Sequence, residues 1–268
     1  MSIHHIEIGV SDLARSVDFY RDLLDLKPVG GGQDASIARL SAGPVTLDLV
    51  EVAGGSLGGW VNDDLQRGVR HIGFKVGDVD LRAERVRDAG VPFTLPPLDA
   101  VGGVRLAFFQ DPDGTHLEII DKYLQYHVIG SAELAARERA AARARPRDAA
   151  PAFDHVAVTA ADLDAALAFY RDMLGYELIG QISQDQDPRG FLLTYLAAGD
   201  AVLEIFTFTA PKTPGPGAPD EARLGFRHVG IAAGDQMSAL LSAAGARSTP
   251  DGLLAGPDGV ALHPVPAR

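Results

Sequence analysis

Apolar and polar residues alternate over residues 5–10, near the start of the chain. In an extended strand, Ile6, Ile8 and Val10 share one face and His5 lies on the other. Apolar residues then recur every three or four positions, as on one face of a helix: Leu13, Val17, Tyr20 and Leu24. The pattern predicts a strand that exposes a histidine on its polar face and runs into an amphipathic helix.

This strand and helix pattern occurs four times. Residues 5–13 recur at 155–163, and both copies continue into Phe-Tyr-Arg-Asp. Two similar stretches, each with one histidine, occupy 69–78 and 226–235. Further apolar, strand-like runs follow the predicted helices at 37–40, 45–52, 105–110, 115–120, 191–196, 201–207 and 259–265. Each copy therefore reads as one strand, one helix and about three more strands.

We predict an α+β protein of four βαβββ units, arranged as two modules. The first module covers residues 1–125, with units at 1–56 and 69–125, and the second covers 152–268, with units at 152–209 and 225–268. Residues 126–151 form a linker rich in Ala and Arg, which we expect to be helical. Ser131 can cap that helix, and Pro146 can end it.

Composition narrows the classes of partner. The net charge is −12, which disfavours nucleic acid and anionic membrane surfaces as the main partner. The absence of cysteine excludes disulfides and cysteine-ligated zinc. No signal-peptide pattern and no membrane-spanning apolar run is present. We therefore expect a cytoplasmic protein, monomeric or homodimeric, whose partner is a small-molecule substrate.

Three motifs narrow the fold further. A histidine is followed by Val-x-Asp-Leu and then Phe-Tyr in the first copy, an Asp-Pro-Asp-Gly turn at 111–114 precedes Leu-Glu-Ile, and the βαβββ pattern repeats. On these motifs the chain resembles the vicinal oxygen chelate superfamily, which includes glyoxalase I, methylmalonyl-CoA epimerase, extradiol dioxygenases and bleomycin- or fosfomycin-resistance proteins. The resemblance implies half-open mixed β-barrels with metal-binding clefts. It does not imply one reaction, because this fold supports several.

The resemblance also implies metal ligands on the first and last strands of each unit. By position these are His5, Asp48, His71, Glu118, His155, Glu204, His228 and His263. Strand alternation supports the carboxylates, since each is flanked by apolar residues that point to the other face. The implied cofactor is a divalent ion: Zn, Ni, Co, Mn or Fe(II). Asp48 is shorter than the usual Glu or Gln, and His263 replaces the usual Glu.

Catalytic and substrate-contacting residues follow from the same strands. The carboxylates that can act as bases at the metal are Asp48, Glu118 and Glu204. The candidates for the substrate cleft are Glu7, Lys75, His116, Phe206 and Phe208. We expect a polar cleft in the first module and a more apolar one in the second. Lys75 could alternatively neutralise Glu7 or a ligand carboxylate.

How the units pair decides which ligands meet. Pairing within each module unites His5 with His71, and predicts a metal site of His5, His71 and Glu118. Exchange of units between modules unites His71 with His155. We predict pairing within modules, because units that are neighbours in sequence usually pack together.

Three functions remain open at this stage. The first is a glyoxalase- or epimerase-like isomerase or lyase that acts through a metal-stabilised enediolate on a substrate with neighbouring oxygens. The second is an Fe(II)-dependent extradiol-type dioxygenase, for which the first module retains a possible facial triad. The third is a metal-free protein that binds a drug or natural product. We favour the first.

Overall fold

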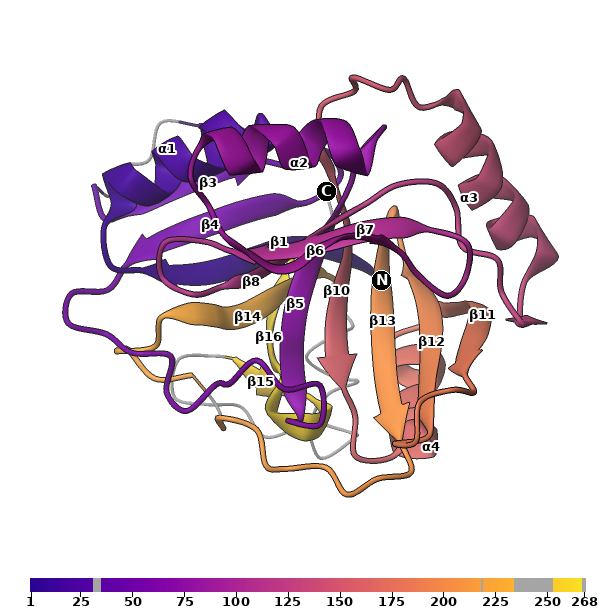
Figure 1. Cartoon of the computed structure of the whole chain (residues 1–268). Coiled ribbons are helices and arrows are strands. Elements are labelled where there is room, and N and C mark those ends of the chain that lie inside the picture. Colours follow the sequence, from indigo (N-terminus) through magenta and orange to yellow (C-terminus); the bar gives the residue numbers. More distant parts are fainter. Residues whose placement is uncertain (31–34, 218, 234–252, 267–268) are drawn as a thin grey trace.

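The computed structural model describes residues 1–30, 35–217, 219–233 and 253–266 of the chain (Figure 1). Unit one contains β1 (Ser2–Val10), α1 (Leu13–Leu24), β2 (Lys27–Pro28), β3 (Ile37–Ser41) and β4 (Thr46–Glu51). Unit two contains β5 (Gly68–Lys75), α2 (Val79–Asp88), β6 (Phe93–Asp99), β7 (Arg105–Gln110) and β8 (His116–Ile120). These elements follow the predicted βαβββ order.

Unit three repeats this order, and unit four is described in part. Unit three contains β10 (Ala152–Thr159), α4 (Leu163–Leu167) with the π-helical turn η1 (Ala168–Met173), β11 (Glu177–Gln184), β12 (Phe191–Ala198) and β13 (Ala201–Phe208). Unit four contains β14 (Gly225–Ala232), β15 (Leu254–Ala255), the short 3₁₀ turn η2 (Pro257–Gly259) and β16 (Ala261–Val265). The helix expected after β14 lies outside the described residues.

Between the halves lie β9 (Val128–Ile129) and α3 (Ala132–Ala144). The Ser131 side chain accepts a hydrogen bond from the backbone N–H of Leu134, which caps α3 as the sequence suggests. The helix ends just before Pro146. None of the helices in the described part of the chain is both long and apolar enough to cross a membrane.

Two mixed sheets contain all the strands listed above. One has seven strands in the order β15-β16-β14-β1-β4-β3-β2, and the other has nine in the order β6-β7-β8-β5-β10-β13-β12-β11-β9. Figure 1 shows β5, β10 and β13 side by side. This architecture is the expected α+β fold with half-open sheets.

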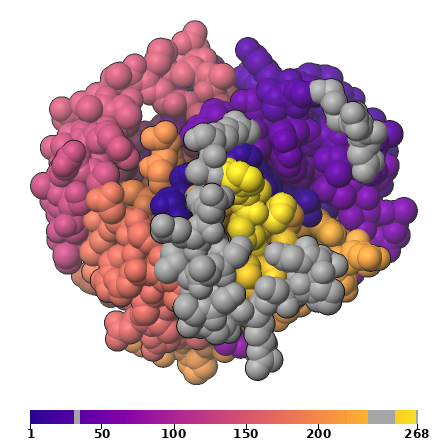
Figure 2. Space-filling model, turned by 180° about the vertical axis from the view of Figure 1, so that it is seen from behind, coloured from indigo at the N-terminus to yellow at the C-terminus, as the bar shows by residue number. Residues whose placement is uncertain are grey.

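The predicted pairing within modules is wrong. β1 pairs antiparallel with β14, and β5 pairs antiparallel with β10, so unit one joins unit four and unit two joins unit three. Figure 2 shows residues of the C-terminal unit, in yellow, next to indigo residues of the N-terminal unit.

Extended connections make the exchange possible. Two isolated bridges join the connections 53–67 and 210–224: Ser56 pairs with Arg223, and Gln66 pairs with Thr213. An extended segment of this length can span about 50 Å, enough to cross between the sheets.

Units one and two still contact each other, but through their helices instead of their strand edges. Arg82 on α2 donates to the backbone oxygen of Leu23 on α1 (2.9 Å), and Arg85 pairs with Asp25 (2.9 Å). The buried Tyr20 hydroxyl donates to Asp111 in the Asp-Pro-Asp-Gly turn (2.9 Å). Units one and two, which are neighbours in sequence, therefore do pack together, but through their helices. The lengths of the connections do not reveal which elements make these contacts.

Candidate metal centre

Four potential metal ligands meet on adjacent strands of the nine-stranded sheet. They are His71 on β5, Glu118 on β8, His155 on β10 and Glu204 on β13. Their four ligand atoms lie within 4.8 Å of one another. The side chains are at most 7% exposed. The exchange of units brings these residues together, since two come from each half of the chain.

The strand register explains this convergence. Gly73 lies opposite Glu118 on one side and opposite His155 on the other, and Ala157 lies opposite both His71 and Glu204. A Cβ atom on Gly73 would lie 2.1 Å from the ring of His155. The missing side chain therefore leaves room for the imidazole to lie flat across the sheet.

The donor atoms are spaced as around a single ion. His71 Nε2 lies 2.9 Å from Glu118 Oε2 and 3.0 Å from His155 Nε2. His155 Nε2 is 3.0 Å from the same Glu118 oxygen. Glu204 Oε2 is further away, at 3.4 Å from His155 and 3.6 Å from His71. Ligands about 2.1 Å from one ion lie about 3 to 3.4 Å apart, which matches these distances.

A second layer of contacts orients the ligands. Asp154 Oδ2 lies 3.0 Å from His155 Nδ1, which favours the tautomer with its proton on Nδ1 and a free lone pair on Nε2. Lys75 Nζ lies 3.6 Å from Asp154. Tyr195, on the strand beside β13, lies directly across the ladder from Glu204. His155 and Glu204 therefore each have a neighbour, Asp154 or Tyr195, that is not one of the four possible ligands.

The electrostatics of the cluster favour a bound cation. Burial alone raises the pKa of Glu118, but the charge and hydrogen bonds of His155 and His71 lower it to about 2. Burial alone lowers the pKa of His155, but Glu204 and Glu118 raise it well above its usual value. The pKa of His71 is also raised, since hydrogen bonds to the two glutamates outweigh burial. Two buried carboxylates thus draw in positive charge, and a divalent ion supplies it.

The cluster lies at one wall of a large cavity. The cavity has a volume of about 710 Å³ and reaches all four ligands. Its walls include the predicted His116 and Phe206, together with Phe108, Tyr126, Phe191, Leu193, Tyr195 and Arg189. A small molecule can therefore reach the ligand atoms from one side.

The cavity corrects the expectation of separate polar and apolar clefts. His116 and Phe206 were assigned to different clefts, yet both line this one. Phe206 faces the cavity as the strand alternation requires, and Phe208 stacks against Phe191 (4.5 Å between ring centres). Phe206 therefore lines the cavity, whereas Phe208 is not among the lining residues.

Lys75 and Glu7 occupy other places than expected. Lys75 contacts Asp154 and does not neutralise Glu7. Glu7 accepts a hydrogen bond from Arg227 (2.8 Å) and lies 3.3 Å from His228 Nδ1. These contacts belong to the seven-stranded sheet, because exchange places β1 beside β14.

The predicted set of His5, His71 and Glu118 does not assemble. His5 lies on the seven-stranded sheet, where its Nε2 is 3.1 Å from His228 Nε2. His263 completes a second group of three possible ligands there. Asp48 does not belong to this group, because Arg39 holds its carboxylate through two hydrogen bonds (2.8 and 2.5 Å).

Several residues of the cavity were missed from sequence. Tyr195 and Phe108 lie directly across the strand ladder from Glu204 and Glu118. Glu138, from α3, accepts a hydrogen bond from Tyr126 at the cavity edge (2.6 Å). Strand pairing could have identified the first two once the register was known, but no signal pointed to a linker helix at the site.

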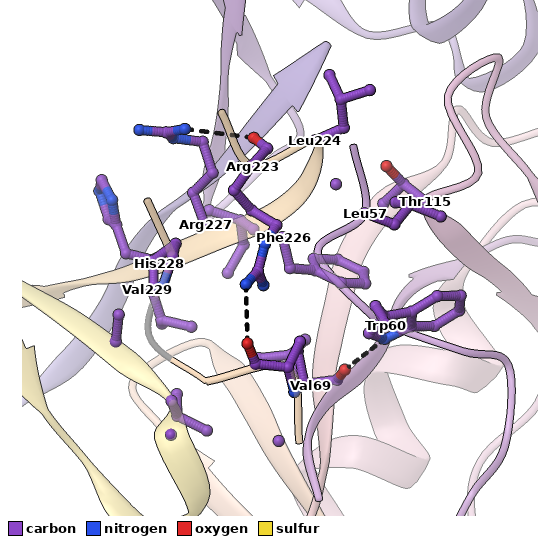
Figure 3. Close-up of a pocket in the computed structure, with 18 of the residues that line it drawn as sticks. Leu57, Trp60, Val69, Thr115, Arg223, Leu224, Phe226, Arg227, His228 and Val229 are labelled. Carbon is purple, nitrogen blue, oxygen red and sulfur yellow. Dashed lines mark hydrogen bonds between the residues drawn. The ribbon is translucent and has the colours of Figure 1, made fainter. Parts of the chain in front are cut away.

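A different, smaller pocket lies where the connections meet β14 (Figure 3). Leu57, Trp60 and Phe226 line it, and the Trp60 indole donates to the backbone oxygen of Val69 (2.9 Å). Its volume of about 40 Å³ is too small for a substrate. This pocket is a packing space between the two sheets.

Comparison with known proteins finds relatives of about half of the fold's length. The lactoylglutathione lyase of Escherichia coli O157:H7 is 29% identical over 130 residues, which cover 46% of this chain and 93% of that protein. A 2-epi-5-epi-valiolone epimerase of Actinomyces sp is 28% identical over 146 residues, 45% of this chain and 79% of that protein. Both matches span about half of this chain, as expected if each corresponds to two units.

Solved structures match over the whole length. The crystal structure of glyoxalase I from Zea mays has a TM-score of 0.67 and 20% identity, and covers 99% of this chain and 92% of that one. At this identity the match supports the fold alone. The model of the Glyoxalase/Bleomycin resistance protein/Dioxygenase superfamily matches residues 2–119 and 152–251. The chain belongs to this superfamily.

Proposed function

We propose that the chain is a divalent-metal-dependent isomerase or lyase, similar in reaction to glyoxalases and epimerases. One observation carries the proposal: two histidines and two glutamates converge at the wall of a cavity that admits a small molecule. The names of the relatives, lactoylglutathione lyase and an epimerase, support the same reaction class. The substrate would carry neighbouring oxygens.

His71, Glu118, His155 and Glu204 would hold the ion. When bound, the ion would act as a Lewis acid toward two substrate oxygens and stabilise an enediolate. Two imidazoles and two carboxylates suit Zn, Ni, Co, Mn and Fe(II). The donor set does not select among them.

Glu204 is the better base of the two glutamates. Its Oε2 lies 3.4 and 3.6 Å from the histidine nitrogens, whereas Glu118 contacts both at 2.9 and 3.0 Å. A loosely held carboxylate can take the proton from the carbon next to the carbonyl and return it to the neighbouring carbon. Burial, followed by the charge of Glu204, raises the pKa of Tyr195 well above its usual value, so the phenol stays protonated and positions Glu204.

The cavity walls point to an uncharged substrate with apolar parts. Carboxylates at the walls outside the cluster are those of Asp63, Asp64, Asp99, Glu138 and Asp154. Arg189, the one arginine or lysine in the described lining, is bound to Asp187 (2.7 Å) and stacks over Phe208 (5.0 Å). A substrate with several carboxylates would meet repulsion here, whereas a neutral ring could stack on Phe191 and Phe206.

Proton exchange tests the proposal without the natural substrate. The protein is stripped with a chelator and reloaded separately with Zn, Ni, Co, Mn or Fe(II). Exchange of the proton next to the carbonyl is followed by NMR in D₂O, with a panel of α-hydroxyketones and hemithioacetals of neutral and anionic thiols. We expect exchange only with metal, faster for neutral compounds. Glu204→Gln should slow it about a hundredfold or more while retaining metal.

Two results would contradict the proposal. Oxygen uptake with catechols by the Fe(II) form, without proton exchange, would indicate a dioxygenase. Tight binding of small aromatic compounds by the stripped protein, with no metal uptake, would indicate a binding protein. Asp48→Asn is the matched control, because Asp48 lies on the other sheet and its loss should not change the exchange rate.

A further inference from the structure

The helix between the two halves of the chain contributes to the large cavity. Glu138 on α3 lines the cavity, together with Leu124 and Tyr126 from the segment before the helix. The start of the helix is fixed to β11, because the backbone N–H of Ser131 donates to the oxygen of Ile179 (3.1 Å). α3 lies between the two stretches that match the superfamily model, so the resemblance assigns no role to it.

The carboxylate of Glu138 is held by one hydrogen bond on each oxygen. The backbone N–H of Leu124 donates to Oε1 (2.9 Å), and the Tyr126 hydroxyl donates to Oε2 (2.6 Å). A carboxylate has about four acceptor positions, two on each oxygen. Glu138 therefore has a fixed orientation and keeps one acceptor position on each of its two oxygens.

The charge of Glu138 is not neutralised by the arginines that follow it on the helix. Arg139 and Arg143 instead lie over the ring of Tyr123, at 5.3 and 5.6 Å from its centre. The contacts of Glu138 in the described part of the chain are its two hydrogen bonds, and neither is an ion pair. A half-buried carboxylate without a cation gains from further hydrogen-bond donors, which a molecule in the cavity can supply.

Adjacent hydroxyls are the donors that suit this position. Two acceptor positions on neighbouring oxygens match two hydroxyls on neighbouring carbons, each of which donates one short, charge-assisted hydrogen bond. A ring with hydroxyls around its edge also presents apolar C–H faces, and Phe191 and Phe206 in the cavity wall can pack against such faces. The carboxylate and the aromatic walls thus match the edge and the faces of the same kind of ring.

We propose that Glu138 determines specificity, by selecting a cyclic ketone that carries several hydroxyls. Two adjacent hydroxyls would donate to Glu138, while the carbonyl and the oxygen next to it face the proposed metal site. This inference rests on the proposed function, because that function supplies the second point at which the ring is held. It gives α3 a role in recognition and no part in the reaction itself.

Two rings with the same chelating group test the proposal. The probes are 2-hydroxycyclohexanone and a pentahydroxycyclohexanone, which share the ring and the hydroxyketone and differ only in the added hydroxyls. Each is titrated into the full-length Zn²⁺-loaded protein and followed by calorimetry. We expect the pentahydroxy ring to bind about tenfold more tightly, and Glu138→Gln to remove most of this difference, because a neutral amide is a weaker acceptor. General damage to the cavity would instead weaken both rings and leave their ratio unchanged.

Two further variants separate recognition from support of the fold. Glu133→Gln is the matched control, since Glu133 is exposed on the same helix and is not among the described cavity residues. It should leave the ratio of the two affinities unchanged. Tyr126→Phe should not lower the ratio, because Glu138 keeps its charge and gains a free acceptor position. Circular dichroism verifies that each variant is folded.

Proton exchange of both rings in D₂O, measured on the same samples, distinguishes this proposal from the proposed function. Exchange of both rings without a difference in affinity would contradict only the role of Glu138. A difference in affinity that Glu138→Gln removes, without any exchange, would contradict only the proposed reaction. The role of Glu138 is also wrong if Tyr126→Phe lowers the ratio as much as Glu138→Gln, since Glu138 would then act only by holding Tyr126.

Discussion

The two sheets place carboxylates at equivalent positions but give them different neighbours. Glu204 on β13 lies across from Tyr195, and Glu118 on β8 lies across from Phe108. Asp48 on β4 lies across from Arg39 and is bound by it. A neutral neighbour leaves the carboxylate available to a metal, whereas a guanidinium takes it. The charge of one cross-strand neighbour thus separates a group of histidines and glutamates from a group of histidines alone.

The outer contacts of the histidines differ in the same way. His155 Nδ1 faces the carboxylate of Asp154, whereas His5 Nδ1 faces the imidazole of His4, at 3.0 Å in both cases. A carboxylate makes its histidine a stronger ligand and draws in positive charge. Burial instead lowers the pKa of His5 to about 4, although Asp48 acts in the opposite direction. The nine-stranded sheet is therefore the place where a metal ion would be held more tightly.

The largest effect should come from filling the space beneath His155. Gly73→Ala places a Cβ atom where the ring lies, so the imidazole must move off the shared point. We expect the metal affinity of the proposed site at His71, Glu118, His155 and Glu204 to fall more than a hundredfold, measured by Co²⁺ titration. The mirror change, Gly230→Ala, should leave this affinity unchanged, because Gly230 lies opposite His5 on the other sheet. Retention of this metal by Gly73→Ala would show that His155 is not a ligand.

Removing the cation next to Asp48 should make the two groups of possible ligands more alike. Arg39→Met leaves the Asp48 carboxylate without its partner, free to turn toward His5. We expect Mn²⁺ binding by the group of His5, His228 and His263 to tighten about tenfold, equivalent to about 1.4 kcal/mol. Arg21→Met, at an exposed position on α1, is the control. Unchanged Mn²⁺ affinity would mean that Asp48 is too short to reach the ion.

The smallest effect concerns acid stability. Burial alone raises the pKa of Glu7, but hydrogen bonds to His228 and Arg227 lower it to about 2, from 4.5. A lowered pKa means that the charged form stabilises the fold above pH 4.5, and that this contribution disappears as the pH falls toward 2. Glu7→Gln should therefore cost about 1 kcal/mol at pH 6 and almost nothing at pH 2, measured by urea unfolding.

A matched change tests whether Glu7 is special. Glu51, at the exposed end of β4, carries the same charge without burial. Glu51→Gln should leave stability unchanged across the same pH range. A constant difference between Glu7→Gln and the native chain at all pH values would contradict the assigned role of Glu7.

The sequence predicted the strands and their inner faces but not how the strands pair. Alternation placed Glu118, Glu204 and Phe206 on the correct face, because the period of two is a local property. Pairing depends on contacts between strands that are distant in sequence. Units that are neighbours in sequence do pack together here, but through helices α1 and α2, so the rule gave the wrong strand pairing. The bond between Arg39 and Asp48 could not be predicted either, because it depends on the register between β3 and β4.

Several strands were not located from the sequence, among them β6 and β11. β6 contains Pro96 and Pro97, and prolines normally argue against a strand because they cannot donate to the ladder. β6 lies at the edge of the nine-stranded sheet and pairs irregularly with β7. An edge position tolerates the missing donors, but sequence alone does not identify an edge.

The exchange of units has a consequence for synthesis on the ribosome. β1 is made first, yet its partner β14 follows about 200 residues later. At about 5 to 20 residues per second, the edge of β1 waits roughly 10 to 40 s for that partner. Units two and three complete their shared sheet sooner, when β13 has emerged. The sheet with the proposed active site can therefore form during translation, whereas the nascent β1 edge needs protection from other chains until the last unit arrives.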